Sequence, residues 1–132
     1  MVSAHELVRS FVIGYTLSVL IEAPVLVLGL SPRHSLRCRL FAGIWLTACT
    51  YPIVCLVLPN LMPGSRSVYL AASETFAAVA ECFLFWAAFV QPHGPVERTA
   101  LRDFAVITLA NLASFLAGEL WYVLVPQAAL LA

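Results

Sequence analysis

Two glutamates inside one apolar run are the residues best placed to do chemistry. Glu74 and Glu81 lie in residues 68–90, VYLAASETFAAVAECFLFWAAFV, a stretch long enough to cross a bilayer. They are seven residues apart, or two helical turns, so both carboxyls share one face of a helix. A charged side chain at the centre of a bilayer costs about 2.5–3.5 kcal/mol on insertion scales. Such groups therefore usually face the interior of a bundle and serve a function.

Two more carboxyls, Glu22 and Glu119, lie in other apolar runs. Glu22 ends a stripe of small residues at every fourth position, which lets helices approach closely in lipid. Pro24 follows it and removes the hydrogen bond that the carbonyl of Leu20 normally accepts. A kink beside a buried acid can open room for water or an ion. The alternative is an ordinary proline of a membrane helix, whose freed carbonyl is satisfied by neighbours.

The composition indicates that the chain dissolves in lipid. Of its 132 residues, 62% are hydrophobic and only 11% are charged, and the mean hydropathy is +0.95. A soluble domain has about 25% charged residues. The formal net charge of zero excludes a basic footprint for nucleic acid. We therefore expect the lipid bilayer as the main partner.

Four apolar segments predict an all-α, integral membrane, antiparallel four-helix bundle that forms a single transmembrane domain over residues 1–132. The expected spans are residues 10–30, 40–60, 68–90 and 104–125. The first is too long for the apolar region of a signal peptide and lacks an Ala-x-Ala site, so we interpret it as a retained helix. Pro52 is expected to bend the second span near its middle.

The arginines predict the orientation of the bundle. Positively charged residues concentrate in the cytoplasmic connections of membrane proteins. This places both termini outside the cytoplasm, in what we expect to be a bacterial inner membrane. Two arginines lie on the outer side, Arg9 and Arg66, and five lie in the connections after the first and third spans: Arg33, Arg37, Arg39, Arg98 and Arg102.

Counting residues from the ends of the spans predicts a deep tier of polar groups. Glu22, Glu81 and Asn111 each lie seven to nine residues from the inner end of their span. At the rise of an α-helix they share a depth of roughly 10 to 14 Å from the inner boundary. Thr47 and Thr50 of the second span bracket that level, and one or the other is expected to join the tier.

A second, outer tier follows from the same count. Glu74 and Glu119 each lie six residues from the outer end of their span, and Tyr51 and Cys55 are the nearest candidates from the second span. Tyr51 is amphipathic, so its hydroxyl needs a partner at this depth. We expect these residues to form the outer access to the deep tier.

Paired carboxyls in a low dielectric do not both ionise cheaply, so they share a proton or hold a cation. Oxygen ligands suit calcium, magnesium or manganese better than zinc, and Glu22 and Glu81 are the expected ligands if a metal binds at all. Alternatively, protonated glutamates only hydrogen-bond across helices, at about 0.6 kcal/mol each on average. No histidine lies inside a span and no Cys-x-x-Cys pair occurs, which excludes a di-iron bundle site, a thioredoxin-like motif and a zinc knuckle.

The string YTLSVLIEAPVLVLG resembles the first helix of small multidrug transporters, four-helix proteins with one essential membrane glutamate there. The likeness covers one span of four and touches only Glu22. Because this chain has four membrane glutamates, we take no activity from it. The strings TYPIVCLVLP, SETFAAVAEC and ANLASFLAGEL resemble a class of small four-span bacterial inner-membrane proteins without known activity. Quinone-linked thiol oxidoreductases are similar in shape, but their Cys-x-x-Cys is missing here.

Two functions follow. In the first, a buried carboxylate cluster binds or relays a proton or a hard cation in a transport process. Glu22 and Glu81 carry the ion and Asn111 orients them. A bundle of 14.4 kDa is small to enclose a pathway alone, so we expect a homo-oligomer.

In the second function, the chain is a non-catalytic subunit or assembly factor of a larger membrane complex, and its glutamates pair with a partner. Glutamates that converge inside one chain favour the first function, and glutamates on the lipid-facing side favour the second. Glu22 with Glu81 could also serve as an acid/base pair beside a lipid-accessible cleft. The chain has no HExxH or GxSxG motif, which argues against an enzyme.

Overall fold

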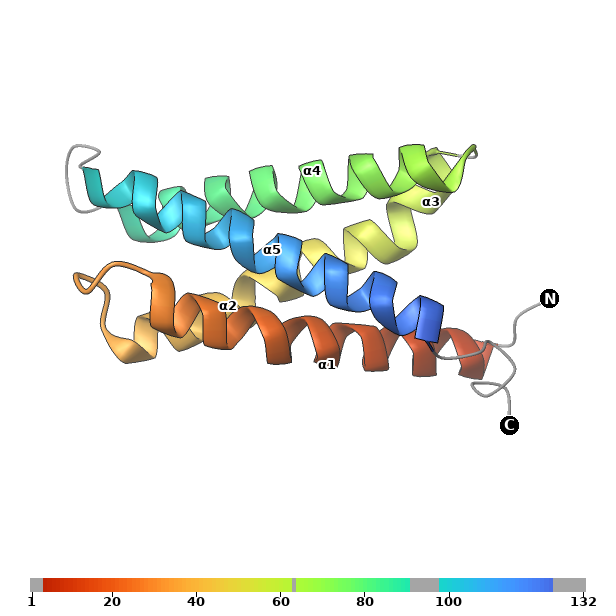
Figure 1. Cartoon of the computed structure of the whole chain (residues 1–132), viewed down its shortest axis with the longest axis horizontal. Coiled ribbons are helices and arrows are strands. Elements are labelled where there is room, and N and C mark those ends of the chain that lie inside the picture. Colours follow the sequence, from red (N-terminus) through yellow and green to blue (C-terminus); the bar gives the residue numbers. More distant parts are fainter. Residues whose placement is uncertain (1–3, 63, 91–97, 125–132) are drawn as a thin grey trace.

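The computed structural model describes residues 4–62, 64–90 and 98–124, and nearly all of them are helical (Figure 1). The predicted all-α bundle is confirmed. In chain order the elements are α1 (Ala4–Gly29), α2 (Leu36–Pro52), the π-helical turn η1 (Ile53–Val57), α3 (Leu58–Leu61), α4 (Arg66–Phe85), the π-helical turn η2 (Trp86–Val90) and α5 (Arg98–Leu124).

Four helical stretches are long and apolar enough to cross a membrane, so the protein is an integral membrane protein with four candidate spans. Each has 25 or 26 residues. The helices begin earlier than the apolar runs: α1 starts at Ala4 and α5 at Arg98. Helical hydrogen bonding therefore continues into polar flanks that hydropathy alone assigned to connections. The candidate spans are Ala4–Gly29, Leu36–Leu61, Arg66–Val90 and Thr99–Leu124.

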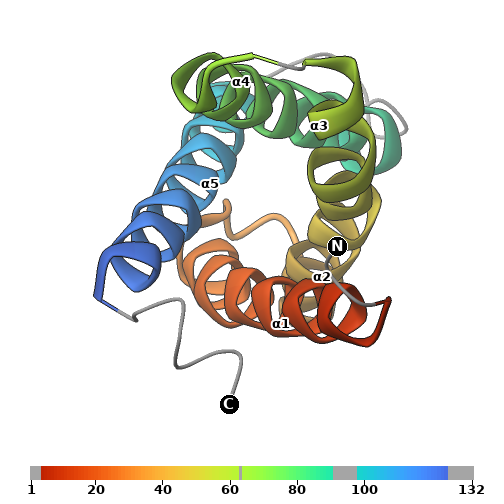
Figure 2. The ribbon, with the colours of Figure 1, turned by 90° about the vertical axis from the view of Figure 1, so that its right-hand side faces the viewer.

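Seen end-on, the helices surround a central axis (Figure 2). Helix α1 packs against α2 and α5, and α4 also packs against α2 and α5. Helices α1 and α4 are thus diagonal partners across the axis, and so are α2 and α5. Side chains from the two members of a diagonal can meet only at the centre of the bundle.

Local sequence signals explain where the helices begin and change. The hydroxyls of Ser35 and Ser65 accept hydrogen bonds from the backbone N–H of Cys38 and Val68, which caps α2 and α4. Pro52 ends α2, and η1 follows it directly. Because proline has no N–H, the regular α-helical ladder cannot pass through it unchanged. The π-helical turn therefore lies at the place where Pro52 was expected to bend the second span.

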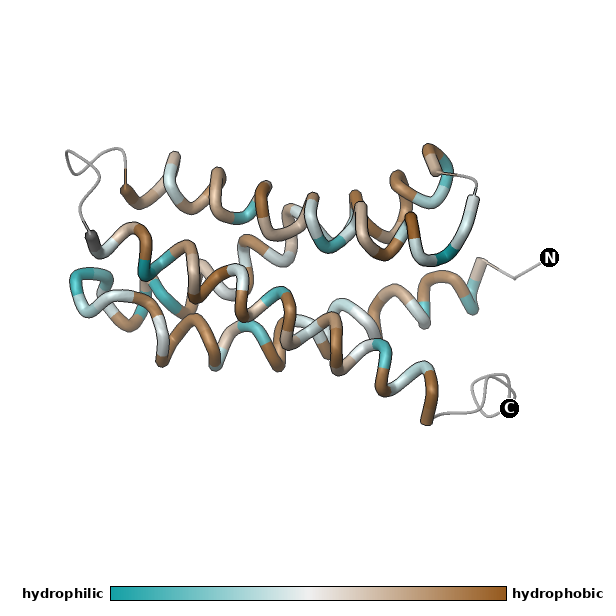
Figure 3. Tube along the Cα trace, turned by 45° about the horizontal axis from the view of Figure 1, so that its top comes forward, coloured by the Kyte–Doolittle hydropathy of each residue, from teal (hydrophilic) through white to brown (hydrophobic). Residues whose placement is uncertain are grey.

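The packed core fills the inner half of the bundle, the half that holds the turn between α1 and α2 and the start of α5. Leu26, Leu30, Leu46, Phe85 and Ile107 are almost completely buried there. Coloured by hydropathy, the helices are mostly hydrophobic, with hydrophilic residues at the turn between α1 and α2 and at isolated positions within the spans (Figure 3).

Helices α1 and α2 approach each other very closely beside the core. A Cβ atom placed on Gly43 would lie 2.7 Å from the Cα of Ala23, well inside van der Waals contact. Only glycine fits at this crossing. The contact fixes the depth of α1 relative to α2, next to Glu22.

Candidate functional site

Glu22 is buried on α1, and each of its carboxyl oxygens has one hydrogen-bond donor. The hydroxyl of Thr47 on α2 lies 2.6 Å from Oε2, and the hydroxyl of Ser114 on α5 lies 2.5 Å from Oε1. The carboxyl is only 4% exposed. Both donors are neutral, and they come from the two helices that flank α1.

Glu81 repeats this arrangement from the diagonally opposite helix, α4. The hydroxyl of Thr50 on α2 donates to Oε1 at 2.7 Å, and the amide of Asn111 on α5 donates to Oε2 at 2.8 Å. Glu81 is 2% exposed. The acids therefore come from one diagonal of the bundle and their donors from the other.

The donors occupy equivalent positions on their helices. Thr47 and Thr50 are three residues apart on α2, and Asn111 and Ser114 are three residues apart on α5, so each pair shares a helix face. The structure thus brings together the five residues of the predicted deep tier. The sequence left a choice between the two threonines, whereas both take part, one for each acid. Ser114 was not among the residues that the sequence predicted for this site.

Each hydroxyl at the site has a second acceptor within its own helix. The Thr47 hydroxyl, for example, lies 3.0 Å from the carbonyl of Gly43 as well as 2.6 Å from Glu22. A hydroxyl carries one proton, so it can donate to only one of them at a time. The same choice exists between Glu81 and Leu46 for Thr50, and between Glu22 and the carbonyl of Asn111 for Ser114.

This choice lets the site accommodate either charge state. When Glu22 is ionised, the Thr47 hydroxyl donates to the carboxylate. When Glu22 is protonated, its O–H donates to the Thr47 oxygen, and that hydroxyl turns its proton to the Gly43 carbonyl. One bond rotation thus preserves every hydrogen bond, which avoids the cost of about 1–3 kcal/mol for an unsatisfied buried polar group.

A cavity of about 600 Å³ extends from the two acids toward the outer end of the bundle. Its wall comes from all four long helices and reaches Ser10 on α1 and Tyr122 on α5. At the inner end it stops at the acids. One turn further inward on the four helices lie buried apolar residues of the packed core, which we call the plug: Leu26, Leu46, Phe85 and Ile107. The cavity is therefore blind at its inner end.

The two acids of the predicted outer tier differ. Both line the cavity. Glu119 forms an ion pair with Arg66, with one guanidinium nitrogen 2.7 and 2.8 Å from the carboxylate oxygens. Arg66 also lies over the ring of Tyr122, 4.6 Å from its centroid. Glu74 is half-buried, and within the described residues it has no hydrogen-bond partner and no cationic partner.

Tyr51, the third residue of the predicted outer tier, also lines the cavity. Its hydroxyl occupies the space beside Gly14, where a Cβ atom would overlap it. The ring makes edge contacts with Phe11 and Tyr15 of α1. Gly14 thus creates the room that lets Tyr51 pack flush against α1 at the cavity wall.

A separate polar network at the inner end was not expected from the sequence. Asp103, assigned to a polar connection, is completely buried in α5. It accepts hydrogen bonds from the backbone N–H of Ser31 at 2.6 Å and from Arg33 at 3.3 Å, and it lies 3.1 Å from Nε2 of His34. The assignment to a connection was wrong because α5 begins before the apolar run. Its spacing of four and eight residues from Ile107 and Asn111 was a usable signal.

Arginines complete this inner network. Arg39 donates to the carbonyl of Val27 at 3.1 Å, and Arg102 donates to the carbonyl of Gly29 at 3.0 Å. The last carbonyls of a helix have no partner within the helix, and cations near them are favourable. The network therefore closes the C-terminal end of α1 and ties it to α5.

The donor set at the central site suits a proton better than a metal ion. Hydroxyl and amide N–H groups point toward the carboxyl oxygens of Glu22 and Glu81, whereas a bound cation requires oxygen lone pairs on all sides. Among the described residues, no group of three or more His, Cys, Asp or Glu side chains is placed to hold a metal.

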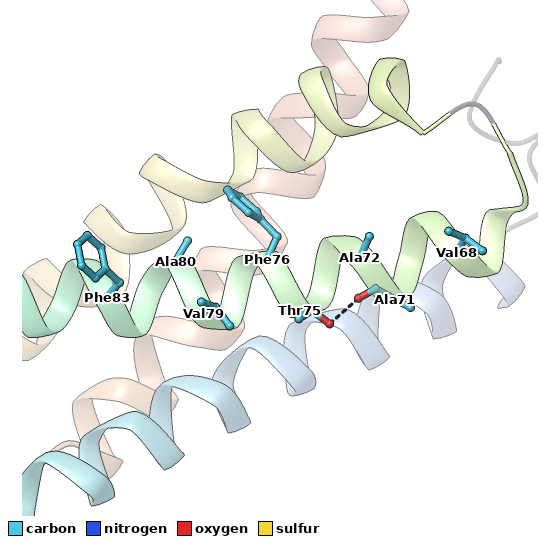
Figure 4. A pocket seen from close by; sticks show the side chains of 8 residues that line it. All are labelled: Val68, Ala71, Ala72, Thr75, Phe76, Val79, Ala80 and Phe83. Atoms are coloured by element: carbon cyan, nitrogen blue, oxygen red, sulfur yellow. Dashed lines mark hydrogen bonds between the residues drawn. The ribbon is translucent and has the colours of Figure 1, made fainter.

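A larger hollow, of about 830 Å³, lies on the outside of α4 (Figure 4). Its one polar side chain, Thr75, donates its hydroxyl to the carbonyl of Ala71 at 2.8 Å. A surface with no ionisable group and no free donor suits lipid chains. Its lining comes from α4 alone: Val68, Ala71, Ala72, Thr75, Phe76, Val79, Ala80 and Phe83.

No family model, curated protein or solved structure matches the chain.

Proposed function

We propose that this membrane protein binds and relays protons at the pair formed by Glu22 and Glu81, as one step of a transport process. The observation that carries the proposal is the double arrangement at the centre of the bundle. Each acid has a neutral donor from α2 and another from α5, and three of the four donors are hydroxyls that can reverse their direction.

The electrostatics of the cavity support this function. Among the residues that the structure describes, none that lines the cavity is a lysine, arginine or histidine. Within the described part of the chain, the hydrogen-bond partners of Glu22 and Glu81 are neutral, so an ionised pair there has no counter-charge beside it. Removing two like charges from water is costly. A proton is the simplest species that restores neutrality, and the hydrogen bonds described above accommodate its arrival and departure.

Glu74 supplies an intermediate station for the proton. It lies two turns outward of Glu81 on the same face of α4 and lines the same cavity. In the opposite direction, the apolar plug separates the pair from Asp103 and His34. The ring of His34 packs edge-on against Phe85, with centroids 5.1 Å apart. Passage to the inner side therefore requires the plug to open.

The glutamates converge within one chain, which is the arrangement that favours an internal site over pairing with a partner protein. The site is also complete in one copy, so proton binding does not depend on the homo-oligomer that we expect from the size of the chain. With the orientation predicted from the arginines, the cavity opens outside the cytoplasm and the plug faces it.

Infrared spectroscopy of the protein in lipid tests this function directly, because a protonated carboxyl has a carbonyl band that a carboxylate lacks. We expect a band from buried carboxyls that weakens as the pH is raised. Glu22→Gln and Glu81→Gln should each remove part of it, and the double variant should remove most of it. Glu119→Gln, at the acid already paired with Arg66, is the matched control and should leave the band intact. A titrating band that survives undiminished in the double variant contradicts the proposal.

Thermal unfolding in detergent separates a proton from a metal ion. A ligand that binds only the folded state raises the midpoint as its concentration rises. We expect no response to calcium, magnesium or manganese. A rise specific to one of these ions, lost in Glu22→Gln and Glu81→Gln, would assign the pair to that cation instead.

A further inference from the structure

We propose that the outer cavity binds a hydrophobic organic cation, and that the cation enters as a proton leaves the central pair. This inference rests on the proposed function and names the second species that the site handles. A volume of about 600 Å³ lies within the range of roughly 300–1,000 Å³ that is usual for small-molecule sites. The cavity therefore has room for a molecule far larger than a hydrated proton.

The charge of the wall selects a cation. Glu22, Glu74 and Glu81 line the cavity, and in the ranges 4–62, 64–90 and 98–124 no basic residue lines it or pairs with them. Glu119 at the outer end is already neutralised by Arg66. An anion in this space would face only acidic and neutral groups, whereas a cation would meet a carboxylate as soon as one proton is released.

The apolar part of the wall excludes a small inorganic ion. Aliphatic side chains from α1, η1 and α4 cover much of it, including Ile13, Leu17, Val54 and Leu70. These groups offer a sodium or calcium ion nothing in place of its lost water. They do offer burial to the hydrocarbon body of an organic ion, at about 25 cal/mol for each Å² removed from water.

Aromatic rings in the wall add a specific attraction for organic cations. Tyr51, Phe115, Trp121 and Tyr122 all line the cavity, and a cation over such a ring gains about 0.5–2 kcal/mol. The molecule already contains one example of this recognition. The guanidinium of Arg66 is held between the carboxylate of Glu119 and the face of Tyr122.

The exchange balances in charge and atoms. The cation enters through the outer opening, one carboxyl O–H of the central pair gives its proton to water in the cavity, and the proton leaves by the same opening. The threonine or serine hydroxyl then turns toward the new carboxylate. No covalent bond to the cation forms or breaks, and the total charge inside the cavity is unchanged.

Two ions of nearly the same shape and opposite charge test the selection. We would titrate the full-length protein with tetraphenylphosphonium and, separately, with tetraphenylborate by calorimetry, in two buffers that differ in ionisation enthalpy. We expect saturable binding of tetraphenylphosphonium with release of up to one proton, and affinity that falls as the pH is lowered. Tetraphenylborate should show no saturable binding. Equal binding of both ions would indicate partition into detergent and would overturn the inference.

A cavity-filling variant separates this inference from the proposed function. Gly118 lines the cavity and a Cβ atom placed on it meets nothing within 4 Å, so Gly118→Trp fills space without a clash at that atom. This variant should weaken the binding of tetraphenylphosphonium by at least about tenfold, and so should Glu81→Gln. Unlike Glu81→Gln, it should leave the titrating carboxyl band in place. Thr75→Ala on the outer hollow of α4 is the control and should bind normally.

The outcomes distinguish the two proposals. A titrating carboxyl band without saturable binding of tetraphenylphosphonium overturns the cation site and leaves the proton site standing. Binding without proton release, in a protein whose carboxyls do not titrate, overturns both the exchange and the proposed function. Binding that is unchanged in a folded Gly118→Trp variant, shown by a normal thermal midpoint, places the ion elsewhere and also overturns the inference.

Discussion

The inner end and the centre of the bundle both bury acids, but they compensate them differently. Asp103 at the inner end is fully buried against Arg33 and His34 and accepts a backbone N–H. Glu22 and Glu81 at the centre are nearly as buried, and their donors are hydroxyls and an amide without charge. The first acid is held beside a permanent cation, whereas the charge of the other two can change without breaking the network.

This difference assigns separate tasks to similar residues. An acid that is paired with arginine and tied to a helix end fixes structure, because its loss leaves several groups without partners. An acid with reversible neutral donors contributes little to stability and is free to exchange a proton. Substitutions at the two places should therefore differ in size and in kind.

The largest effect is expected from Asp103→Ala. It leaves the N–H of Ser31, the guanidinium of Arg33 and the ring of His34 without their buried partner, and breaking a buried ion pair typically costs about 3–5 kcal/mol. Unfolding by denaturant in mixed micelles measures the loss. Asp103→Asn keeps an oxygen acceptor and should lose clearly less. If Asp103→Ala is no more harmful than Glu81→Gln, the distinction between the two regions fails.

Gly43→Ala should have the next largest effect, because its methyl group would overlap Ala23 and force α1 away from α2. Overpacking of this kind costs about 1–3 kcal/mol. Moving α1 away from α2 should also lengthen the hydrogen bond from Thr47 to Glu22. The infrared band of Glu22 should therefore change more than that of Glu81. Gly118→Ala, with open space around its Cβ, is the matched control and should leave both stability and band unchanged.

Glu22→Gln and Glu81→Gln should have small effects on stability. Glutamine keeps an oxygen acceptor, and a hydrogen bond between membrane helices is worth about 0.6 kcal/mol on average. Their effect should instead appear in the carboxyl spectrum and in proton release. A loss of several kcal/mol at either position, measured by the same unfolding assay, would place these acids with Asp103 as structural groups.

The smallest effect is expected from Arg66→Ala at the outer end. The pair with Glu119 is partly exposed, and exposed ion pairs contribute about 0–1 kcal/mol. Thermal unfolding should barely change. By freeing a carboxylate at the opening of the cavity, the substitution should tighten tetraphenylphosphonium binding, and weaker binding would contradict the role given to the acidic wall.

The sequence predicted well how deep each polar residue lies along its helix, and it predicted poorly which neighbours its side chain reaches. Counting at the rise of an α-helix placed Glu22, Glu81 and Asn111 at one level, and the structure brings them together. Ser114 lies on the same face of α5 as Asn111, but counting could not reveal that its short side chain reaches Glu22 on the neighbouring helix, so it was missed. The position of Asp103 was missed for another reason: hydropathy marks where apolar residues begin, whereas the helix begins where its backbone hydrogen bonds begin.

The ion pair between Arg66 and Glu119 also could not be predicted from the sequence. Glu74 and Glu119 lie at the same outer level by residue count, but Arg66 reaches only Glu119. Which acid Arg66 reaches depends on how two helices are rotated about their own axes and on the ring of Tyr122, over which the guanidinium lies. No residue pattern encodes these quantities, although the presence of an outer tier was evident from spacing.

The π-helical turn η2 sets the rotational phase at the end of the third span. Phe85 and Val90 are both buried, although they are five residues apart. In a continuous α-helix, residues five apart point about 140° away from each other. The i→i+5 bonding of a π-helix stacks them instead. The turn thus acts as a one-residue insertion that the fold absorbs, and deleting a residue there would restore the α-helical count and also move Val90 to the fourth position after Phe85. Which residues are buried at the end of this span therefore depends on the number of residues in the turn more than on the identity of any side chain.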